Sequence, residues 1–320
     1  MLQSWFRDSP GPAAALFTMS LLPGTHLRRR LRRIVARFRR AIRALRSRAS
    51  RDPSSQVLHV KECPICGGPG AFEYENGLSL LSRCRECDHV YARDLPSDKA
   101  LTALYGDLGY WEKDRCHQGI TTIQEGKGWE GYLNARIGIL QRLGLLDHRS
   151  NRATSVFEIG CAEGMLLHEL GKRGIEASGC EMNVVVAKEG IRQLGASILT
   201  VPFEKIELPP RHFDLVMSFH TLEHMRFPIE VFRKAADILR EEGAMLVEVP
   251  CGEEEYDNTD HLHFFCDKSL RLLLDRFFIS TEIVNNFYTN SAGVRIGSIY
   301  GFGRGVRSEE AVHVAARSRP

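Results

Sequence analysis

The segment from Ser155 to Leu167, SVFEIGCAEGMLL, constrains the fold of this chain more than any other. It predicts a buried strand that passes through a glycine turn, Gly160 to Gly164, into a helix. Such a turn lets backbone N–H groups and the positive end of the helix approach a ligand. The third glycine of the dinucleotide fingerprint and the Lys-Ser/Thr pair of a P-loop are both missing, which argues against those two sites. Glycine turns of this kind often only pack a helix tightly on a strand, so the sequence downstream decides its role.

Composition sets the class of protein. The chain has 320 residues, 43 % of them apolar, and no run approaches the roughly 18 apolar residues of a membrane span. The net charge of +3 hides an asymmetry, since residues 1–51 hold thirteen Arg and one Asp and the remainder is acidic. An acidic body argues against a dedicated nucleic-acid-binding protein. The nine Cys form an odd set in which four stand at metal-ligand spacing, which indicates a reducing compartment rather than a disulfide scaffold.

The organisation along the chain changes four times. We expect an Arg-rich segment at 1–55, a cysteine module at 56–95, a helical cap or linker at 96–150, an alternating strand–helix domain at 151–304 and a polar tail at 305–320. Strands are expected at Ser155–Gly160, Glu176–Glu181, Ser197–Val201, Phe213–Phe219, Ala244–Val249, Ser280–Asn285 and Val294–Gly301. Helical stretches separate the early strands, so the fold class is α/β with a mostly parallel sheet covered on both faces.

The Arg-rich segment contains an amphipathic pattern at residues 27–48. Its apolar positions recur at helical spacing and its arginines largely surround the other face, which is typical of a helix lying on an anionic membrane surface. The alternatives are nucleic-acid contact, a mitochondrial transit peptide, a disordered basic tail, or an overlong start with Met19 as the true initiator. The stretch Ala13 to Leu22 has too little positive charge before it for a secretory signal. We therefore expect a cytoplasmic, membrane-associated protein, or an imported mitochondrial one in a eukaryote.

The cysteine module carries two C-x-x-C knuckles, Cys63–Cys66 and Cys84–Cys87, with seventeen residues between them. Four thiolates on two tight turns complete a tetrahedral zinc site. A closed site of this kind has no open coordination position, so we expect structural zinc rather than a catalytic metal. The sequence between the knuckles, FEYENGLSLLSRC, predicts a β-hairpin. A pair of redox dithiols is the alternative.

A carboxylate, Glu181, ends the second expected strand about twenty residues past the glycine turn, where it can accept hydrogen bonds from ribose hydroxyls. The fourth expected strand, FDLVMSF, runs directly into HTLEH at 220–224. In order and spacing, the series FEIGCAEG, GCEMN, HFDLVMSFHTLEHM and LREEGAMLVEVP resembles the class I S-adenosylmethionine (SAM)-dependent methyltransferases over residues 153–304. It is most similar to their ubiquinone-type and methyltransferase-23-like branch, some relatives of which also carry a cysteine module.

The resemblance implies a Rossmann-like seven-stranded methyltransferase sheet, a helical cap, and SAM as the methyl donor. The implied SAM-binding residues are Glu158, Gly160, Cys161, Ala162 and Gly164 around the methionine part, Glu181 at the ribose, Met182, Phe203 and Glu204 at the adenine, and His220, Thr221 and Leu222 over the sulfonium. Ala162 departs from the pattern by replacing a habitual glycine, which costs little if its backbone is not left-handed. Glu204 stands where an Asp is common.

The histidines offer several chemistries. His220, Glu223 and His224 stand at i, i+3 and i+4, which is one face of a helix. In the ubiquinone-type enzymes a Glu-x-x-Glu-His group at this place is associated with a divalent metal, so these three residues are a candidate metal site. Alternatively His224 or His220 is a general base, or the group only holds the following loop. In the later sequence DHLHFF, His261 or His263 is expected either to face the acceptor pocket as a further catalytic residue or to be a core or capping histidine.

These observations favour a SAM-dependent methyltransferase acting at oxygen on a small-molecule or lipid- or sugar-linked acceptor. An RNA methyltransferase is the first alternative, because ribosomal RNA methyltransferases also pair a cysteine module with such a domain. The acidic body and the lack of a basic-aromatic stripe weigh against it. A non-catalytic SAM-binding assembly protein is the second alternative.

Overall fold

The computed structural model describes residues 57–75, 80–118, 120–123, 125–146, 154–251, 258, 260–289 and 295–308. The chain from Pro53 onward forms one compact unit. The amphipathic pattern at 27–48 and the alternative start at Met19 lie outside the described residues, so the expectations for them stay predictions. Within the described ranges, no helix combines the length and the apolar character needed to cross a membrane.

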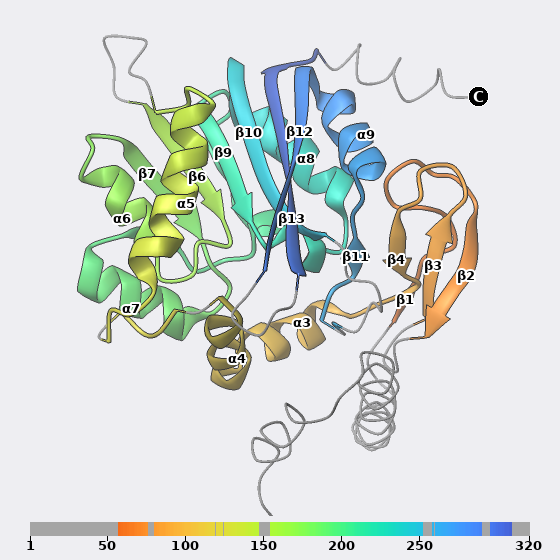
Figure 1. The fold of residues 1–320 in the computed structure, drawn as a ribbon, viewed down its shortest axis with the longest axis horizontal. Helices are drawn as coiled ribbons and strands as arrows, with labels where there is room; N and C mark the ends of the chain where they lie inside the picture. Colours follow the sequence, from red (N-terminus) through yellow and green to blue (C-terminus); the bar gives the residue numbers. More distant parts are fainter. Residues whose placement is uncertain are drawn as a thin grey trace, which may run out of the picture. The chain divides into compact units, whose positions relative to one another are not determined.

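A seven-stranded sheet lies at the centre of this unit, in the order β12-β13-β10-β9-β6-β7-β8 (Figure 1). Its strands are β6 (Ser155–Ile159), β7 (Glu176–Cys180), β8 (Ser197–Leu199), β9 (Phe213–Phe219), β10 (Leu239–Cys251), β12 (Phe278–Thr289) and β13 (Arg295–Val306). Neighbours from β10 to β8 are parallel, whereas β13 is antiparallel to both β10 and β12. The expected strands and the expected α/β class are confirmed, and the last three strands are longer than predicted.

Helices cover both faces of this sheet. The helices α5 (Trp129–Arg142), α6 (Met165–Gly171) and α7 (Val184–Leu194) precede β9 in the chain, and α8 (Pro228–Ile238) and α9 (Asp267–Phe277) follow it. Side chains alternate along the buried strands: Val156 and Leu215 pack with α5 and α6, while Phe157 and Val216 pack with α8 and α9. This period of two separates the core into two layers, as expected for a doubly covered parallel sheet.

Local sequence signals place the helix ends beside the carboxyl ends of the strands. The Asn183 side chain accepts hydrogen bonds from the backbone N–H groups of Val185 and Val186 and so begins α7, which ends at Gly195 in a left-handed conformation. Pro228 occupies the first turn of α8, where no N–H partner is needed. These caps fix how each chain segment leaves the sheet above the site.

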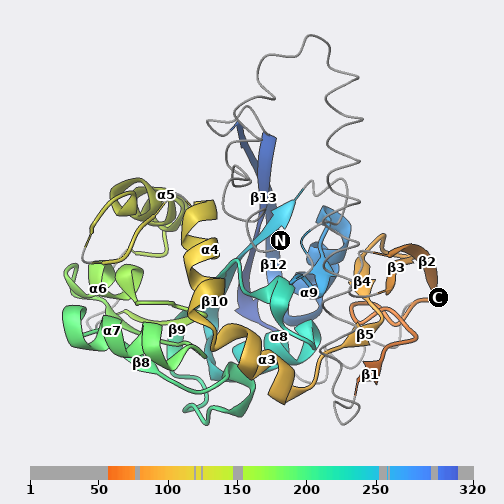
Figure 2. The same cartoon turned by 90° about the horizontal axis from the view of Figure 1, so that it is seen from below.

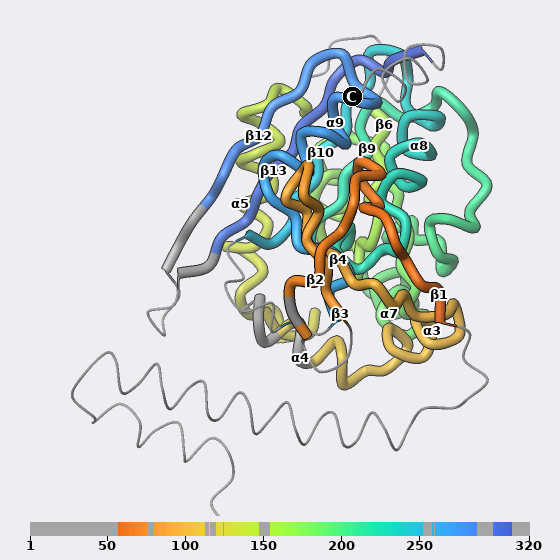
Figure 3. The backbone as a smooth tube through the Cα atoms, turned by 90° about the vertical axis from the view of Figure 1, so that its right-hand side faces the viewer, coloured from red at the N-terminus to blue at the C-terminus, as the bar shows by residue number. Residues whose placement is uncertain are grey.

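The cysteine module forms a small sheet in the order β11-β4-β3-β2, which lies beside α9 in Figure 1 and faces the viewer in Figure 3. Its strands are β2 (Gly70–Glu75), β3 (Leu80–Cys84), β4 (Val90–Ala92) and β11 (His263–Phe264), and β1 (Leu58–His59) pairs with β5 (Asp94–Leu95). The expected hairpin between the knuckles is β2–β3. The fourth strand of this sheet, β11, comes from the far end of the chain, which the sequence did not suggest.

Two helices, α3 (Asp98–Tyr105) and α4 (Leu108–Gln118), lie across the carboxyl ends of the strands (Figures 1 and 2). The Ser97 side chain caps α3. Asp98 in its first turn forms ion pairs with Lys205 and with Arg226. Helices of the expected cap or linker at 96–150 are therefore tied to loops that follow β8 and β9.

Candidate active site

A cavity opens where β6, β7 and β9 end, and it holds about 1030 Å³ of empty space when its open mouth is included. Of the residues that the sequence assigned to cofactor binding, its wall includes Gly160, Ala162, Glu181, Met182, Phe203, Glu204, His220 and Thr221. Glu158, Cys161, Gly164 and Leu222 do not line it. The glycine turn and the HTLEH segment thus meet at one cavity although about sixty residues separate them in the chain.

The glycine turn needs its unusual backbone. Gly160 has φ +74°, and a Cβ atom there would lie 2.3 Å from Thr221 Oγ1. Ala162 also has a left-handed backbone, with φ +49°. Alanine at this position therefore costs conformational energy. The sequence analysis expected a low cost only for a backbone that is not left-handed, and that condition is not met. The turn nevertheless forms, because its N–H groups are held by the neighbouring strand end, as the contacts of Glu181 show.

Glu181 is fixed by two backbone donors. The Ala162 N–H donates to one carboxylate oxygen at 3.1 Å and the Asn183 N–H donates to the other at 2.7 Å. Burial raises the pKa of Glu181 to about 7, although these N–H groups favour its charged form. Its carboxylate is thereby held at the cavity wall between the first two strand ends, where a vicinal diol would meet both oxygens.

The floor beside Glu181 is apolar. Phe203, in the 3₁₀ turn Phe203–Lys205, packs at 6.0 Å from the Phe157 ring centroid, and Lys234 Nζ donates to the Phe203 carbonyl at 2.6 Å. Met182 also lines this part of the cavity. An aromatic ring and a thioether next to a carboxylate are suited to a nucleoside, so the residues present fit the donor that the sequence implies.

Glu158 lies behind the wall, on β6. It is 3 % exposed, and its Oε2 has no hydrogen-bond partner among the described residues. Burial raises the pKa of Glu158 to about 8, an effect that the nearby Arg136 guanidinium opposes. At neutral pH this carboxyl is largely protonated, which lets it remain in an apolar layer.

His220 stands between two carboxylates. Its Nε2 lies 3.2 Å from Glu248 Oε1 and its Nδ1 lies 3.6 Å from Glu223 Oε1. Burial opposes its charged form, but the Glu248 and Glu223 charges outweigh burial and raise the pKa of His220 to about 10. Arg136 Nη2 lies 3.9 Å from the second carboxylate oxygen of Glu248, Oε2. His220 is therefore an imidazolium at neutral pH, held in a left-handed backbone with φ +50°.

His224 has a different environment in the short turn Leu222–His224. Its Nδ1 donates to the Asp260 carbonyl at 3.0 Å, and this contact assigns the ring proton to Nδ1. The Nε2 atom lies 3.9 Å from Glu223 Oε1. The His224 ring lines the cavity and meets the edges of Tyr105 and His261, with centroids 5.7 Å and 4.8 Å away. Of the two cavity histidines, His224 has one ring nitrogen on a backbone carbonyl, whereas both ring nitrogens of His220 face carboxylates.

The ligand atoms of Glu223, His224 and His261 lie within 4.8 Å of one another, a set suited to a divalent ion. The sequence instead grouped His220 with Glu223 and His224. In the structure His220 points its two nitrogens at Glu248 and Glu223, and His261 takes its place in the cluster. His261, from a distant loop, was not predicted as a member of this cluster, although it was named as a residue that could face the pocket.

His263 does not reach the cavity. It is 1 % exposed, and its Nδ1 lies 3.1 Å from His89 Nε2 in the cysteine module. Burial lowers the pKa of His263 to about 4, so both rings of this pair are neutral. The structure thus places this candidate catalytic residue in the packing between module and sheet, which is the core alternative stated for the DHLHFF segment.

The cap supplies most of the aromatic wall. Tyr105, Tyr110 and Trp111 come from α3 and α4, and Trp129 and Tyr132 come from α5. Arg115 of α4 forms an ion pair with Glu163 in the glycine turn, so the cap is attached to the donor side. The sequence analysis did not single out these aromatic residues, because their helical spacing has the same appearance in a packed core and in a cavity wall.

Comparison with known proteins agrees with this arrangement. Residues 132–281 match the methyltransferase-23 family model, described as a methyltransferase domain. These residues form a class I SAM-dependent methyltransferase domain. The methyltransferase domain is 27 % identical over 103 residues to a ubiquinone biosynthesis O-methyltransferase of Stutzerimonas stutzeri and 26 % identical over 109 residues to one of Nitrosospira multiformis. The matches cover 30 % and 32 % of this chain and 44 % and 46 % of those relatives, so the chain spans about half their length.

Solved structures with a similar fold include phosphoethanolamine N-methyltransferase 2 of Haemonchus contortus in complex with S-adenosyl-L-methionine. It has 12 % identity and a TM-score of 0.45, and the match covers 54 % of this chain and 53 % of that one. The YcgJ protein of Bacillus subtilis has 10 % identity and a TM-score of 0.41, with 56 % of this chain and 99 % of that one covered.

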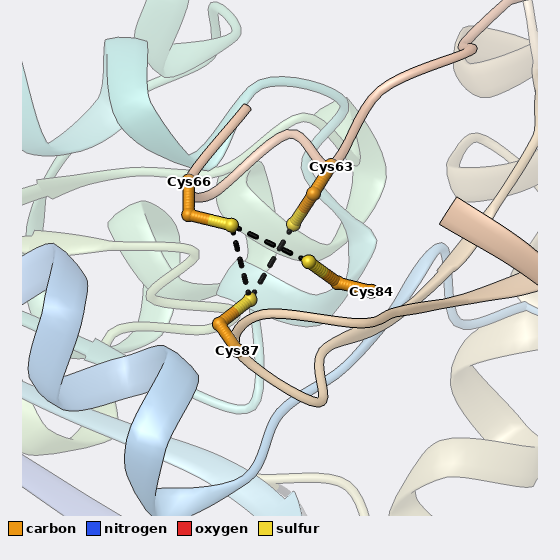
Figure 4. A group of neighbouring side chains, drawn as sticks. All are labelled: Cys63, Cys66, Cys84 and Cys87. Carbon is orange, nitrogen blue, oxygen red and sulfur yellow. Dashed lines mark hydrogen bonds between the residues drawn. The ribbon is translucent and has the colours of Figure 1, made fainter. Parts of the chain in front are cut away.

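Beside the methyltransferase domain, the four knuckle cysteines converge on one point (Figure 4). Their Sγ atoms lie 3.4 to 3.6 Å apart across the pairs Cys66–Cys84, Cys66–Cys87 and Cys63–Cys87. These separations are near the roughly 3.8 Å edge of a tetrahedron with Zn–S bonds of about 2.3 Å. Backbone N–H groups of Ile65, Gly68 and Glu86 donate to three of the sulfurs at 3.4 Å, which favours thiolates. The residues therefore fit a zinc ion.

Proposed function

We propose that this chain transfers a methyl group from SAM to an oxygen of a small-molecule or lipid- or sugar-linked acceptor. SAM supplies an electrophilic methyl group on its sulfonium, so the protein has to align the acceptor, exclude water and remove the acceptor's proton. The single observation that carries the proposal is the placement of His224, with an assigned Nδ1 proton, on the same cavity wall as Glu181 and the glycine turn.

The donor half of the cavity would hold SAM. Glu181 accepts hydrogen bonds from the ribose hydroxyls, while Met182 and Phe203 pack on the adenine. The glycine turn would pass along the methionine part, and Gly160 packs so closely on Thr221 that no side chain fits at this point of the turn. These roles follow the family resemblance, and the positions of all four residues on one wall support them.

His224 would be the general base. A base has to accept a proton near neutral pH, and in that role His224 would keep its Nδ1 proton on the Asp260 carbonyl and take the acceptor's proton at Nε2. His220 is unsuited to that role because two carboxylates keep it protonated. We assign His220 the role of a fixed positive charge that holds Glu223 and Glu248 in place.

The acceptor would enter under the cap. The aromatic side chains of α3, α4 and α5 line a cavity that suits an apolar or ring-bearing small molecule better than a folded RNA. Arg115, the cationic side chain that α4 contributes to the cavity wall, is already paired with Glu163. The activity named for the two relatives, ubiquinone biosynthesis O-methyltransferase, also supports a small-molecule acceptor and methylation at oxygen.

Two measurements test the proposal. Calorimetric titration with S-adenosylhomocysteine (SAH) is expected to give binding, and Glu181→Ala is expected to weaken it. Isotope-labelled SAM, incubated with a cell extract separated into RNA, lipid and small-molecule fractions, is expected to label the lipid or small-molecule fraction. The control His212→Gln changes a histidine at the opposite end of β9 and should leave both results unchanged.

Three results would reject the proposal in different ways. Absence of SAH binding would remove the methyl donor. Label in the RNA fraction would favour the RNA methyltransferase alternative. Binding of SAH without transfer to any fraction would favour a non-catalytic SAM-binding protein.

A further inference from the structure

The cysteine module and the methyltransferase domain share backbone hydrogen bonds. β11 follows β10 in the chain but pairs with β4 of the module, His263 opposite Tyr91 and Phe264 opposite Val90. The Ala92 N–H also donates to the Leu262 carbonyl at 2.9 Å, which extends the pairing by a residue. A part of the methyltransferase domain thus relies on the module for its strand partner.

Side chains fix this junction close to the second knuckle. His89, two residues after Cys87, is fully buried and stacks on His263 with ring centroids 5.3 Å apart. The Cys266 Sγ contacts the Cys87 carbonyl at 3.4 Å. Residues 260–266, which we name the linking segment, are therefore anchored at their far end to the turn that carries a metal-ligating cysteine.

The near end of the linking segment reaches the active site. The Leu262 N–H donates to the Glu223 carbonyl at 2.9 Å, and the Asp260 carbonyl accepts the His224 Nδ1 proton at 3.0 Å. Between them the His261 ring meets His224, and Asn258 Nδ2 donates to His261 Nε2 at 2.8 Å. Only two residues separate Asp260, which orients the base, from His263, which packs on the module.

The donor half has no such dependence. The carboxylate of Glu181 is held by the N–H groups of Ala162 and Asn183, and both belong to loops of the central sheet. A disturbance of the module would therefore reach His224 before it reaches Glu181. The buried knuckle turns depend on their metal because structural zinc sites contribute folding free energy to the small domains that hold them.

We propose that the metal-loaded cysteine cluster positions His224 through β4 and the linking segment, so that the module is a working part of the acceptor half of the site. The inference rests on the proposed function for the role of His224 in catalysis. Release of the metal frees β4, the Asp260 carbonyl moves from His224 Nδ1, and the ring loses its fixed tautomer and orientation. SAM binding persists under the same conditions.

The test follows the His224 ring directly, without an acceptor. Proton–nitrogen correlation spectra of isotope-labelled histidine rings report the tautomer of His224, and His224→Gln assigns its signal. In full-length protein with its zinc content measured, we expect a ring protonated at Nδ1. After zinc is removed with a chelator, we expect mixed tautomers, while the SAH dissociation constant changes by less than about twofold, as for distant independent sites.

A backbone variant separates the linkage from the metal itself. Ala92→Pro removes the N–H that bonds the Leu262 carbonyl and keeps all four cysteines. It is expected to retain zinc and SAH binding and to lose the fixed tautomer. Lys268→Ala is the matched control, because it removes an exposed ion pair with Asp88 across the same junction and leaves the linking segment intact. Labelled-methyl transfer should fall about a hundredfold in Ala92→Pro, the size expected for a misplaced catalytic group, and stay unchanged in the control.

Several outcomes would overturn the inference. One is a protein isolated with no zinc, and another is a His224 tautomer that stays fixed after zinc removal or in Ala92→Pro. Loss of SAH binding together with the tautomer would also overturn it, because the cluster would then support the whole domain. A native protein that never binds SAH defeats the proposed function instead, while its His224 spectra still answer the question of linkage.

Discussion

The two halves of the cavity are built in different ways. The donor half comes from short loops after adjacent parallel strands, and its carboxylate, Glu181, is held by backbone N–H groups from those same loops. The acceptor half is lined by the cap and the turn after β9 and is supported by β10 and the linking segment, with His224 oriented by a carbonyl thirty-six residues away. The first half is therefore robust to change elsewhere in the chain, and the second depends on long-range contacts.

The largest expected effect comes from removing the base. His224→Gln should lower the rate of methyl transfer about 10²- to 10⁴-fold, the usual contribution of general acid–base catalysis, and leave SAH binding unchanged. Rates from single-turnover transfer and affinities from calorimetry separate the two. Equal losses in rate and SAH affinity would mean that His224 serves the donor half, and the division of the cavity would fail.

The second largest effect is expected in the donor half, as a change of SAH affinity with pH. At pH above about 7 the Glu181 carboxylate is ionised and can accept ribose hydroxyl hydrogen bonds, and below that pH it is protonated. SAH affinity should therefore fall about tenfold for each pH unit below 7, because binding then requires loss of a proton. Calorimetry from pH 5 to 8.5 measures the profile. Glu181→Gln should bind weakly with no slope near pH 7, and an equally steep slope in that variant would assign the titration to another group.

The His220–Glu248 pair in the acceptor half predicts a stability effect. The pKa of His220 is raised to about 10 in the folded protein, so its stabilisation is fully present below the unfolded value of about 6.5 and is lost as pH rises toward 10. Denaturant unfolding should show stability falling across that range. Glu248→Gln removes one carboxylate and leaves Arg136 and His220 with less compensation, which should cost about 3 kcal/mol at neutral pH.

The slope of the unfolding free energy against pH distinguishes the His220–Glu248 pair from other titrating groups. Glu248→Gln should flatten the alkaline part of the profile, since His220 then loses its larger charge partner. A control variant, Glu241→Gln, removes an exposed pair with Arg211 and should change stability by less than about 0.5 kcal/mol. An alkaline slope that is the same in wild type and Glu248→Gln would contradict the raised pKa of His220.

The sequence predicted the donor half better than the acceptor half for a physical reason. The glycine turn, Glu181 and the strand pattern are local, so a short window contains all of their constraints. Glu248 was missed because it sits inside a buried strand, where only its contact with His220 reveals a role. For the DHLHFF segment the sequence left open whether His261 or His263 faces the pocket or packs in the core, and the two-residue strand pairing with β4 turns His263 away and leaves His261 beside His224. No pattern in the sequence predicts such a short strand between distant segments.

Ala162 shows that even a local expectation depends on one backbone angle. With φ +49° it lies in the region where a side chain costs about 1 to 2 kcal/mol, and glycine would remove that cost. Glycine also increases the conformational entropy of the unfolded chain, which lowers stability by about 0.4 to 1 kcal/mol. Ala162→Gly should therefore stabilise the protein by about 0.5 to 1 kcal/mol in total. The Ala162 N–H still donates to Glu181, so SAH affinity should not change. Ala103→Gly, in the exposed interior of α3, is the control and should destabilise by about 1 kcal/mol. If thermal unfolding instead shows Ala162→Gly to be as destabilising as the control, the turn is not strained, and alanine at this position costs as little as the sequence analysis expected for a backbone that is not left-handed.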